Sequence, residues 1–379
     1  MYKYEELLSI VKNFDIKGDI VNIDAINKGI INTTYIIECN YNGIIYKYLL
    51  QKINTNAFKE PYKLMKNIDN VTNYIRDNDD ELKEVLHIIK TKNNLSLYVR
   101  EDLFSHKEYY RLYNYIDNTI SYDNSTDYNV VYNVGVAFGH FCKVLRNYPI
   151  DMLEDTIENF HNTKKRFEKF LETYKLNPVG RNKKAFYQVS EILSRKDECS
   201  IITNLLESGK IPYRVTHNDT KVNNVLMDPI KDEPVAVIDL DTVMKGSCLY
   251  DYADGIRSIS SNAKEDEKDL SKVTLNMDMF KAYTDGYLKE MALYLNEYEV
   301  NNMANSIKII TLELAIRFLD DYLSGDTYFK TSYDEHNLDR CKNQLKLVHE
   351  IEKNFDLIED YIMDSYNKYK GISKVKKAK

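Results

Sequence analysis

Apolar and polar positions near the start of the chain follow the pattern of a small sheet. Apolar residues alternate with polar ones over 20–26, and apolar runs follow over 34–38 and 44–50. A period of two is typical of half-buried strands. The sequence Tyr41-Asn42-Gly43 between the last two runs is a strong signal for a hairpin turn. These features predict three antiparallel strands within residues 20–50.

The sheet is expected to continue further along the chain. Two strand-like runs lie within 81–99, and the run 109–116 is rich in aromatic residues. We expect 109–116 to be the last strand of this part of the molecule, with Asn114, Tyr115 and Ile116 as a hinge to the rest. An ordinary edge strand with aromatic side chains is the alternative interpretation of this segment.

Most of the remaining chain has the spacing of helices. Apolar residues recur every three or four positions in 4–13 and 130–145, in segments that end near 75 and 174, in 185–206, 277–298 and 301–323, and in a last segment to about 369. An early antiparallel sheet followed by many helices predicts an α+β protein. A chain of 379 residues is also too long for one minimal core. We expect a smaller lobe over residues 1–116 and a larger, mainly helical lobe over 117–379.

One stretch of the helical part, VTHNDTKVNNVLMDPIKDEPVAVIDLDT at 215–242, has a strand–loop–strand pattern instead. Asp219, Lys221 and Asn224 lie in its first loop, and Asp239 ends the buried run 235–238. The order H-x-D-x-K-x-x-N, followed by a strand that ends in Asp, is the spacing of a phosphoryl-transfer loop and its metal-binding Asp. A polar loop with acids at strand ends is the alternative, but four elements in order and in register favour phosphoryl transfer.

The residue types suit that chemistry. Phosphoryl transfer requires mainly positioning and charge neutralisation. The place of Asp219 in the motif predicts that it orients an acceptor hydroxyl and takes its proton. The place of Lys221 predicts that it approaches the transferred phosphate. Asn224 and Asp239 offer the hard oxygen ligands that Mg²⁺ prefers.

The smaller lobe should contact the phosphates of a nucleotide. The turn 29–33 contains Gly29, Asn32 and Thr33, which could place backbone N–H groups and a hydroxyl over phosphates, although one glycine in a hairpin is more often only a turn. The third strand should supply a cation, and it ends in Gln51 and Lys52. Because strand residues alternate between faces, only one of these two side chains can point inward.

Candidates for binding the acceptor lie in the helical lobe. His161 lies at a helix start, where it has either a purely local role or donates to the acceptor. In the helix 301–323, Arg317 and Asp321 lie on one face with Glu313. A solvated ion-pair ladder is the plain interpretation of this spacing. Apolar neighbours of Arg317 instead indicate partial burial and a specific partner. Tyr328, in the turn after this helix, is the last candidate for binding the acceptor.

Composition narrows the function classes. The net charge of −7 argues against a general nucleic-acid binder, and no apolar run approaches the length that spans a bilayer. The five cysteines are scattered and follow no metal-binding or disulfide spacing, which favours a reducing cytoplasm. We expect a monomer or homodimer acting on a small molecule.

At this point the sequence resembles a known family. HNDTKVNN, AVIDLDTV and LYDYADGIR resemble the aminoglycoside phosphotransferase and choline kinase superfamily of small-molecule kinases. More narrowly, LQKINTN at 50–56, NFHNT at 159–163 and RFLDDYLSGDTYFK at 317–330 resemble the N-acetylhexosamine 1-kinases.

The resemblance implies a two-lobed, protein-kinase-like fold with ATP in the cleft and Mg²⁺ on its phosphates. By motif position, Asp219 would be the base, and Asn224 and Asp239 the metal ligands. The reaction implied is phosphorylation of the anomeric hydroxyl of N-acetylglucosamine or N-acetylgalactosamine. Gln51 stands where many superfamily members carry Lys or Arg. An aminoglycoside or choline-type acceptor remains the alternative, and a relative that binds nucleotide without catalysis is a third possibility.

Overall fold

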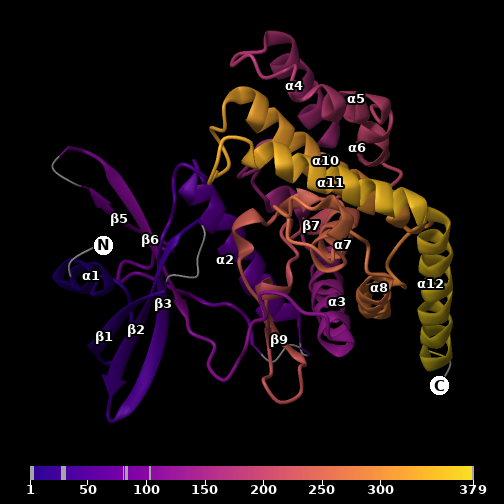
Figure 1. Cartoon of the computed structure of the whole chain (residues 1–379). Coiled ribbons are helices and arrows are strands. Elements are labelled where there is room, and N and C mark those ends of the chain that lie inside the picture. The colour runs from indigo at the N-terminus through magenta and orange to yellow at the C-terminus, as the bar shows by residue number, and fades with distance from the viewer. Residues whose placement is uncertain (1–3, 27–30, 80, 82–83, 102–103, 378–379) are drawn as a thin grey trace.

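The computed structural model of this chain describes residues 4–26, 31–79, 81, 84–101 and 104–377. Its strands and helices separate into a smaller lobe built on a sheet and a larger lobe built of helices (Figure 1). This arrangement confirms the α+β class and the two-lobed fold expected from the sequence. The exact boundary between residues 116 and 117 stays a prediction.

The smaller lobe is a twisted antiparallel sheet with strand order β1-β2-β3-β6-β4, in which β5 also pairs with β6. The strands are β1 (Asp19–Ile26), β2 (Thr33–Tyr41), β3 (Ile44–Lys52), β4 (Ile88–Ile89), β5 (Tyr98–Glu101) and β6 (Lys107–Asn114). The predicted hairpin joins β2 to β3, where Asn42 and Gly43 both have positive φ, 54° and 84°. Helix α1 (Tyr4–Val11) packs its apolar residues against one face of this sheet.

Helix α2 (Pro61–Asn78) connects the two lobes. It begins with Pro61 in its first turn and buries a stripe of apolar side chains. Its fully buried Asn67 donates hydrogen bonds to the carbonyl oxygens of Glu154 (2.8 Å) and Val243 (2.9 Å). The side-chain amide oxygen of Asn67 accepts a hydrogen bond from the Glu154 N–H (2.9 Å), so one side chain holds two segments of the larger lobe.

The larger lobe is mainly helical. Its helices are α3 (Tyr128–Val144), α4 (Thr163–Leu176), α5 (Phe186–Ser194), α6 (Ile201–Glu207), α7 (Cys248–Ile259), α8 (Met277–Met291), α9 (Glu297–Asn301), α10 (Met303–Ser324), α11 (His336–Lys353) and α12 (Phe355–Lys377). Figure 1 shows α10 and α11 running side by side across this lobe, with α4, α5 and α6 beyond them.

Three predicted helical segments are broken in the structure. The segment 185–206 is divided into α5 and α6 by a 3₁₀ turn at Glu198–Ser200. The segment 277–298 stops at Met291, and a new helix begins after Asn296, which forms a reciprocal capping box with Glu299. The last segment is two helices that meet at Asn354. Apolar periodicity continues across these breaks, so periodicity alone did not locate them.

Two short antiparallel strand pairs support the stretch with the phosphoryl-transfer spacing. Strand β7 (Arg214–Thr216) pairs with β10 (Met244–Gly246), and β8 (Val225–Met227) pairs with β9 (Pro234–Val237). The loop with Asp219 therefore leads from β7 to the β8–β9 hairpin, and the loop with Asp239 leads back to β10. This topology brings the two polar loops together.

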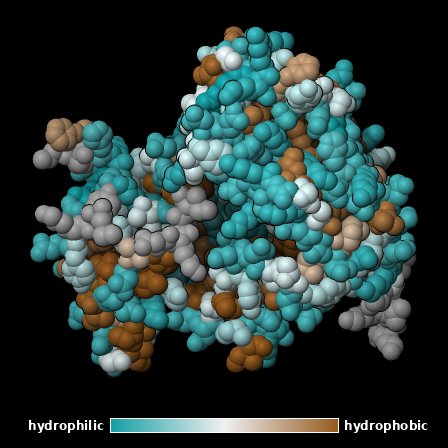
Figure 2. Space-filling view, viewed as in Figure 1, coloured by the Kyte–Doolittle hydropathy of each residue, from teal (hydrophilic) through white to brown (hydrophobic). Residues whose placement is uncertain are grey.

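Figure 2 shows a hollow between the smaller lobe and the helical lobe on the face in view. Within the described residues, no helix is both long enough and apolar enough to cross a membrane.

Candidate active site

The loop that carries Asp219 is fixed by its first residue. The His217 ring is fully buried and lies edge-on to the rings of Phe138 and Phe141 on α3. Its Nε2 donates to the Ile238 carbonyl at 2.9 Å, and its Nδ1 accepts from the Asp219 N–H at 3.3 Å. One neutral tautomer satisfies both contacts, so the ring ties the first polar loop to the end of β9.

Two acids of helix α7 complete the support of this loop. The Asp251 carboxylate accepts the backbone N–H groups of His217 (2.8 Å) and Asn218 (2.7 Å). Asp254 accepts the Thr220 N–H at 3.1 Å and pairs with Arg257. Asn218 has a positive φ of 64°, which these bonds stabilise. The sequence indicated that these two acids at the start of a helix brace the loop, and the hydrogen bonds give both of them this positioning role.

Asp219 lies between two polar side chains of its own loop. Lys221 Nζ is 2.7 Å from its Oδ1, and the Asn224 amide donates to its Oδ2 at 3.1 Å and to its carbonyl at 2.8 Å. Burial alone would lower the pKa of Lys221, but the charges of Asp219 and Asp254 outweigh it and raise that pKa, so the ammonium stays charged. The Asp219 side chain is 26% exposed and therefore accessible to an acceptor.

Asp239 lies two residues after β9 in a left-handed conformation, with φ 61°. Partial desolvation, followed by the charges of Asp241 and Asp219, raises its pKa to about 6. A carboxylate that is solvent-accessible but crowded by other carboxylates suits a divalent cation. Asn224 is buried next to Asp219 and uses its amide NH₂ there, so its amide oxygen is the atom suited to the same cation. The donor set predicted from the sequence thus fits a hard divalent metal.

The smaller lobe contributes a charged cluster that the sequence analysis missed. The buried Arg111 of β6 forms a two-pronged ion pair with Asp241, at 2.5 and 2.8 Å. Its Nε and Nη2 also donate to Oε1, the side-chain amide oxygen of Gln51, at 2.9 and 2.8 Å. The Asn32 amide donates to Asp241 Oδ2 at 2.7 Å, the same oxygen that accepts from Arg111 Nη2. Asp241 is therefore held by two residues of the smaller lobe.

The remaining small-lobe predictions have different outcomes. Gly29 lies outside the described residues. Thr33 is exposed at the start of β2. Of the two cation candidates on β3, Lys52 has its side chain on the face of the sheet opposite to Gln51, where it pairs with Glu108 at 2.6 Å. Gln51 is the residue that points inward.

The expected hinge follows β6. The Tyr115 N–H donates to the Lys47 carbonyl at 3.2 Å, and the Lys47 ammonium lies 5.6 Å from the centre of the Tyr115 ring. Ile116 is buried in a small apolar cluster with Val235 and Ala236 of β9. The two residues thus lie at the junction of the lobes, one with an exposed ring and one with a buried side chain.

His161 lies at the beginning of α4 and faces helix α10. Its Nδ1 lies 2.8 Å from the Glu313 carboxylate, whose other oxygen accepts from Thr163 at 2.5 Å. The His161 ring also lies 5.3 Å from that of Tyr250, which is on the helix that braces the Asp219 loop. The side chain is 8% exposed and its Nε2 has no protein partner among the described residues. Nε2 is thus available to a ligand.

Arg317 and a second arginine lie near this histidine. The Arg317 guanidinium lies 5.2 Å from the ring centre of Phe160 and 5.7 Å from that of Phe329. Burial and then the charge of Arg317 lower the pKa of Arg166, which shows that the two guanidinium groups are close. Tyr328 is 65% exposed, and its ring packs against Phe329. The sequence analysis missed Arg166, since an Arg in a charged helix gives no signal of burial.

The role of Asp321 in binding the acceptor stays a prediction, and the structure gives its carboxylate a set of local contacts. One carboxylate oxygen accepts the backbone N–H groups of Thr327 (2.9 Å) and Tyr328 (2.8 Å). The other accepts from the Phe329 N–H and the Asn337 amide, each at 2.9 Å. Both oxygens are thus used to hold the turn after α10, and contact with an acceptor is not required to explain this buried acid.

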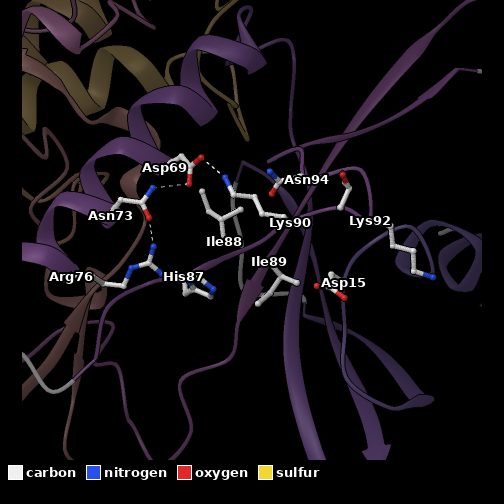
Figure 3. A pocket seen from close by; sticks show the side chains of 11 residues that line it. Asp15, Asp69, Asn73, Arg76, His87, Ile88, Ile89, Lys90, Lys92 and Asn94 are labelled. Atoms are coloured by element: carbon white, nitrogen blue, oxygen red, sulfur yellow. Dashed lines mark hydrogen bonds and ion pairs between the residues drawn. The ribbon is translucent and has the colours of Figure 1, made fainter.

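A separate cavity of about 450 Å³ lies between α2 and the edge strand β4 (Figure 3). Its lining includes Asp15, Asp69, Asn73, Arg76, His87, Ile88, Ile89, Lys90, Thr91, Lys92 and Asn94. Lys90 pairs with Asp69, and Arg76 contacts Asn73 and His87. No residue of the phosphoryl-transfer motif lines this cavity, so it is separate from the candidate active site.

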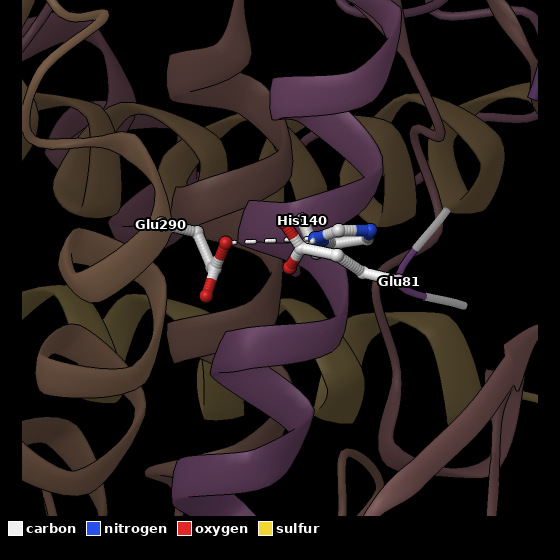
Figure 4. A group of neighbouring side chains, drawn as sticks. All are labelled: Glu81, His140 and Glu290. Carbon is white, nitrogen blue, oxygen red and sulfur yellow. Dashed lines mark ion pairs between the residues drawn. The ribbon is translucent and has the colours of Figure 1, made fainter. Parts of the chain in front are cut away.

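Glu81, His140 and Glu290 lie close enough together to hold a metal ion (Figure 4). However, the Lys143 ammonium already lies 2.9 Å from Glu290 and 3.3 Å from Glu81. His140 Nε2 lies 2.9 Å from Asp79. The cluster is therefore interpreted as an ion-pair network that joins α3, α8 and the segment after α2.

Comparison with known proteins agrees with this geometry. The model of the phosphotransferase enzyme family matches residues 22–287, well over half of the chain. An aminoglycoside phosphotransferase from Alicyclobacillus acidocaldarius has 11% identity and a TM-score of 0.62, with 94% of this chain and 96% of that one covered. Choline kinase from Cryptosporidium parvum Iowa II has 14% identity and a TM-score of 0.59, with 95% and 98% covered.

A third solved structure is the amicoumacin kinase in complex with AMP-PNP, Ca²⁺ and Ami, with 12% identity, a TM-score of 0.60, and coverage of 91% of this chain and 93% of that one. At these identities the solved structures establish the fold, and the family match establishes the class of enzyme. The expectations of a two-lobed kinase-like fold and of a phosphate-transferring enzyme are confirmed. The chain belongs to the phosphotransferase enzyme family.

Proposed function

We propose that this phosphotransferase moves the γ-phosphate of ATP to the anomeric hydroxyl of an N-acetylhexosamine. Asp219 orients that hydroxyl and takes its proton while the oxygen bonds to phosphorus and the bond to the departing ADP breaks. Lys221, paired with Asp219, approaches the transferred group as a point charge. Asn224 and Asp239 are the residues that would hold Mg²⁺, which when bound neutralises charge on the phosphates.

The nucleotide is proposed to lie between the lobes. Its adenine would rest near Tyr115 and Ile116, where Ile116, Val235 and Ala236 form a buried apolar cluster at the junction. Its phosphates would extend toward Asp239 beneath the segment that contains Asn32 and Thr33. The amicoumacin kinase of the same fold was solved with AMP-PNP and Ca²⁺, which supports a nucleotide with a divalent cation for this chain as well.

The choice of a neutral sugar depends on one observation: the nearby acids already have partners. Glu313 is bound by His161 and Thr163, and Asp321 by the turn that follows it. The groups left to meet an acceptor are the Nε2 of His161 and the guanidinium of Arg317. An N-acetyl sugar offers hydroxyl and carbonyl oxygens to such donors, whereas the ammonium of an amine would meet like charge.

A second candidate acceptor is an amine such as an aminoglycoside or choline. Asp320 favours it, because its Oδ1 is buried without a protein partner among the described residues, while its Oδ2 is 3.4 Å from Lys169. The similarity in fold to an aminoglycoside phosphotransferase and a choline kinase is consistent with this alternative.

A panel assay separates the two candidates. ADP release is measured with Mg-ATP and, in turn, N-acetylglucosamine, N-acetylgalactosamine, glucose, choline, ethanolamine and kanamycin. We expect the highest kcat/KM with an N-acetylhexosamine, and we expect Arg317→Ala to raise KM for it. Turnover of an amine without turnover of any N-acetyl sugar would refute the sugar assignment while leaving the phosphotransferase class intact.

A further inference from the structure

The centre of the small-lobe sheet carries one buried positive charge that the phosphoryl-transfer motif does not include. Arg111 lies in the middle of β6, its side chain is 2% exposed, and it faces Asp241 two residues after Asp239. Burial by itself lowers the pKa of the Arg111 guanidinium, but Asp241 outweighs burial and raises it. The group is therefore a permanent cation at the edge of the expected phosphate site.

Within the described residues of the smaller lobe, no other cation is buried in the same way. Lys52 pairs with Glu108 on the opposite face of the sheet. Lys47 pairs with Asp117 at the junction of the lobes, at 3.3 Å. Arg100 pairs with Glu6 and Glu108.

The register of the sheet explains why Arg111 can replace a cation on β3. Gln51 and Arg111 are direct cross-strand partners, so their side chains leave the same face at the same height. The side-chain amide oxygen of Gln51 accepts hydrogen bonds from two N–H groups of Arg111 and fixes the plane of the guanidinium. A cation on β6 thus reaches the place that the inward residue of β3 would reach.

We propose that Arg111 is the residue of the smaller lobe that binds the nucleotide phosphates, with Gln51 and Asp241 as its positioning residues. This inference rests on the proposed use of ATP. Before the nucleotide binds, Asp241 neutralises Arg111 and aims its planar fork toward the Asp239 loop. Asp241 and Gln51 use four of the five N–H groups of the guanidinium, and the second N–H of Nη1 has only Met65 Sδ at 3.9 Å. Phosphate oxygens then take this N–H and share the fork with Asp241.

The test compares ligands with and without phosphates. Affinities for Mg-ADP, Mg-AMP-PNP and adenosine are measured by calorimetry for the wild type, Arg111→Gln, Arg111→Lys, and the exchange variant Arg111→Gln/Gln51→Arg. We expect Arg111→Gln to weaken both nucleotides about 10- to 100-fold, the loss typical of a charged hydrogen-bonded contact, while adenosine binding stays unchanged. The exchange variant should recover most of this loss, because it returns the charge to the same height in the sheet.

Lys52→Gln is the matched control, since Lys52 is adjacent to Gln51 in sequence but lies on the opposite face. It should leave the ratio of nucleotide to adenosine affinity unchanged. Equal loss of adenosine and nucleotide binding in Arg111→Gln, no recovery in the exchange variant, or a selective loss in Lys52→Gln would each overturn the proposal. If Arg111→Gln does not fold, Arg111→Lys and the exchange variant provide the same comparison.

The outcome also separates this inference from the proposed function. A wild-type protein that binds neither nucleotide would refute the use of ATP. A wild-type protein that binds both, with Arg111→Gln equally able to bind them, would refute only the role of Arg111.

Discussion

At the scale of single residues, the neighbours of Asp219 determine the orientation of its carboxylate. Lys221 contacts one of its carboxylate oxygens and Asn224 contacts the other. The backbone on either side of Asp219 is held by Asp251 and Asp254. These contacts fix the orientation of the carboxylate before an acceptor arrives. A fixed base loses little additional freedom in the reaction.

Replacement of Asp219 by Asn should therefore remove catalysis and keep binding. The Asn side chain has the same shape but cannot accept the acceptor proton, so we expect kcat to fall by about 10²- to 10⁴-fold. Affinity for Mg-AMP-PNP, measured by calorimetry, should change little. Asp334→Asn makes the same chemical change at an exposed position and should have wild-type kcat. Wild-type turnover in Asp219→Asn would show that another group takes the proton.

The sequence located the residues that share one loop but not those brought together across the sheet. Asp219, Lys221 and Asn224 have a fixed spacing, so their proximity follows from local geometry. Arg111 meets Asp241 only because β6 pairs with β3 and the lobes close on each other. An Arg between aromatic residues of a strand was the available signal, since a charged side chain inside a buried strand requires a partner.

At the scale of elements, the crossing of α3 and α8 is unusually close. A Cβ atom on Gly135 would lie 2.3 Å from the backbone oxygen of Tyr283, and one on Gly286 would lie 2.0 Å from that of Tyr132. Backbone oxygens cannot move aside without displacing their helices. Gly135 and Gly139 are four residues apart on α3, a spacing that permits close helix contact but does not identify the partner helix.

Gly135→Ala should destabilise the protein. The added methyl group must push α8 away, and overpacking of this kind typically costs about 1–3 kcal/mol. Urea unfolding followed by circular dichroism measures the loss. Gly371→Ala is the control, because nothing lies near a Cβ at that position of α12. Equal stability of the two variants would contradict the packing described for this crossing.

The ion-pair network around His140 predicts a pH dependence of stability. Burial lowers the pKa of the imidazole, but hydrogen bonds to Glu290 and Asp79 outweigh burial and raise it above its usual value of 6.5, despite the nearby Lys143. The folded protein thus binds the proton more tightly than the unfolded chain does. The contribution of this group is fully present below about pH 6.5 and is lost as pH rises through the raised pKa.

His140→Gln tests this dependence through melting temperatures measured from pH 5 to pH 9. We expect the variant to melt several degrees below the wild type at pH 5 to 6, and the difference to shrink steadily toward pH 9. His349→Gln, at a half-exposed position, should show a smaller difference at low pH. A difference that stays constant or grows with pH would exclude a protonated His140 as its cause.

At the scale of the whole molecule, the polar contacts between the two lobes include the hinge after β6, the pairing of Arg111 with Asp241, and the hydrogen bonds of Asn67. The fold class was predictable because the sheet and helix patterns occupy separate parts of the chain. The position of the hinge was also predicted, but the side-chain contacts of Arg111 and Asn67 were not, because each joins residues that are far apart in the sequence and gives no periodic signal.

The absence of Trp from the chain permits a test of the hinge. Tyr115 is 36% exposed at the junction, so Tyr115→Trp places a single indole where adenine is proposed to rest. Mg-ADP should change its fluorescence with a saturable dependence on concentration, because stacking removes the indole from water. Tyr187→Trp on α5, at a position 75% exposed, should show no such change. If the nucleotide binds but the fluorescence of Tyr115→Trp does not change, the adenine does not lie next to residue 115.

The cross-strand pairing of Gln51 with Arg111 also has a consequence for descent within the family. A lineage that gained Arg at the β3 position before losing it on β6 would pass through a doubly basic intermediate and never lack a cation in the cleft. The site of that charge can therefore drift between adjacent strands under continuous selection. If Arg111 binds the phosphates, relatives are better compared at both positions together than at either position alone.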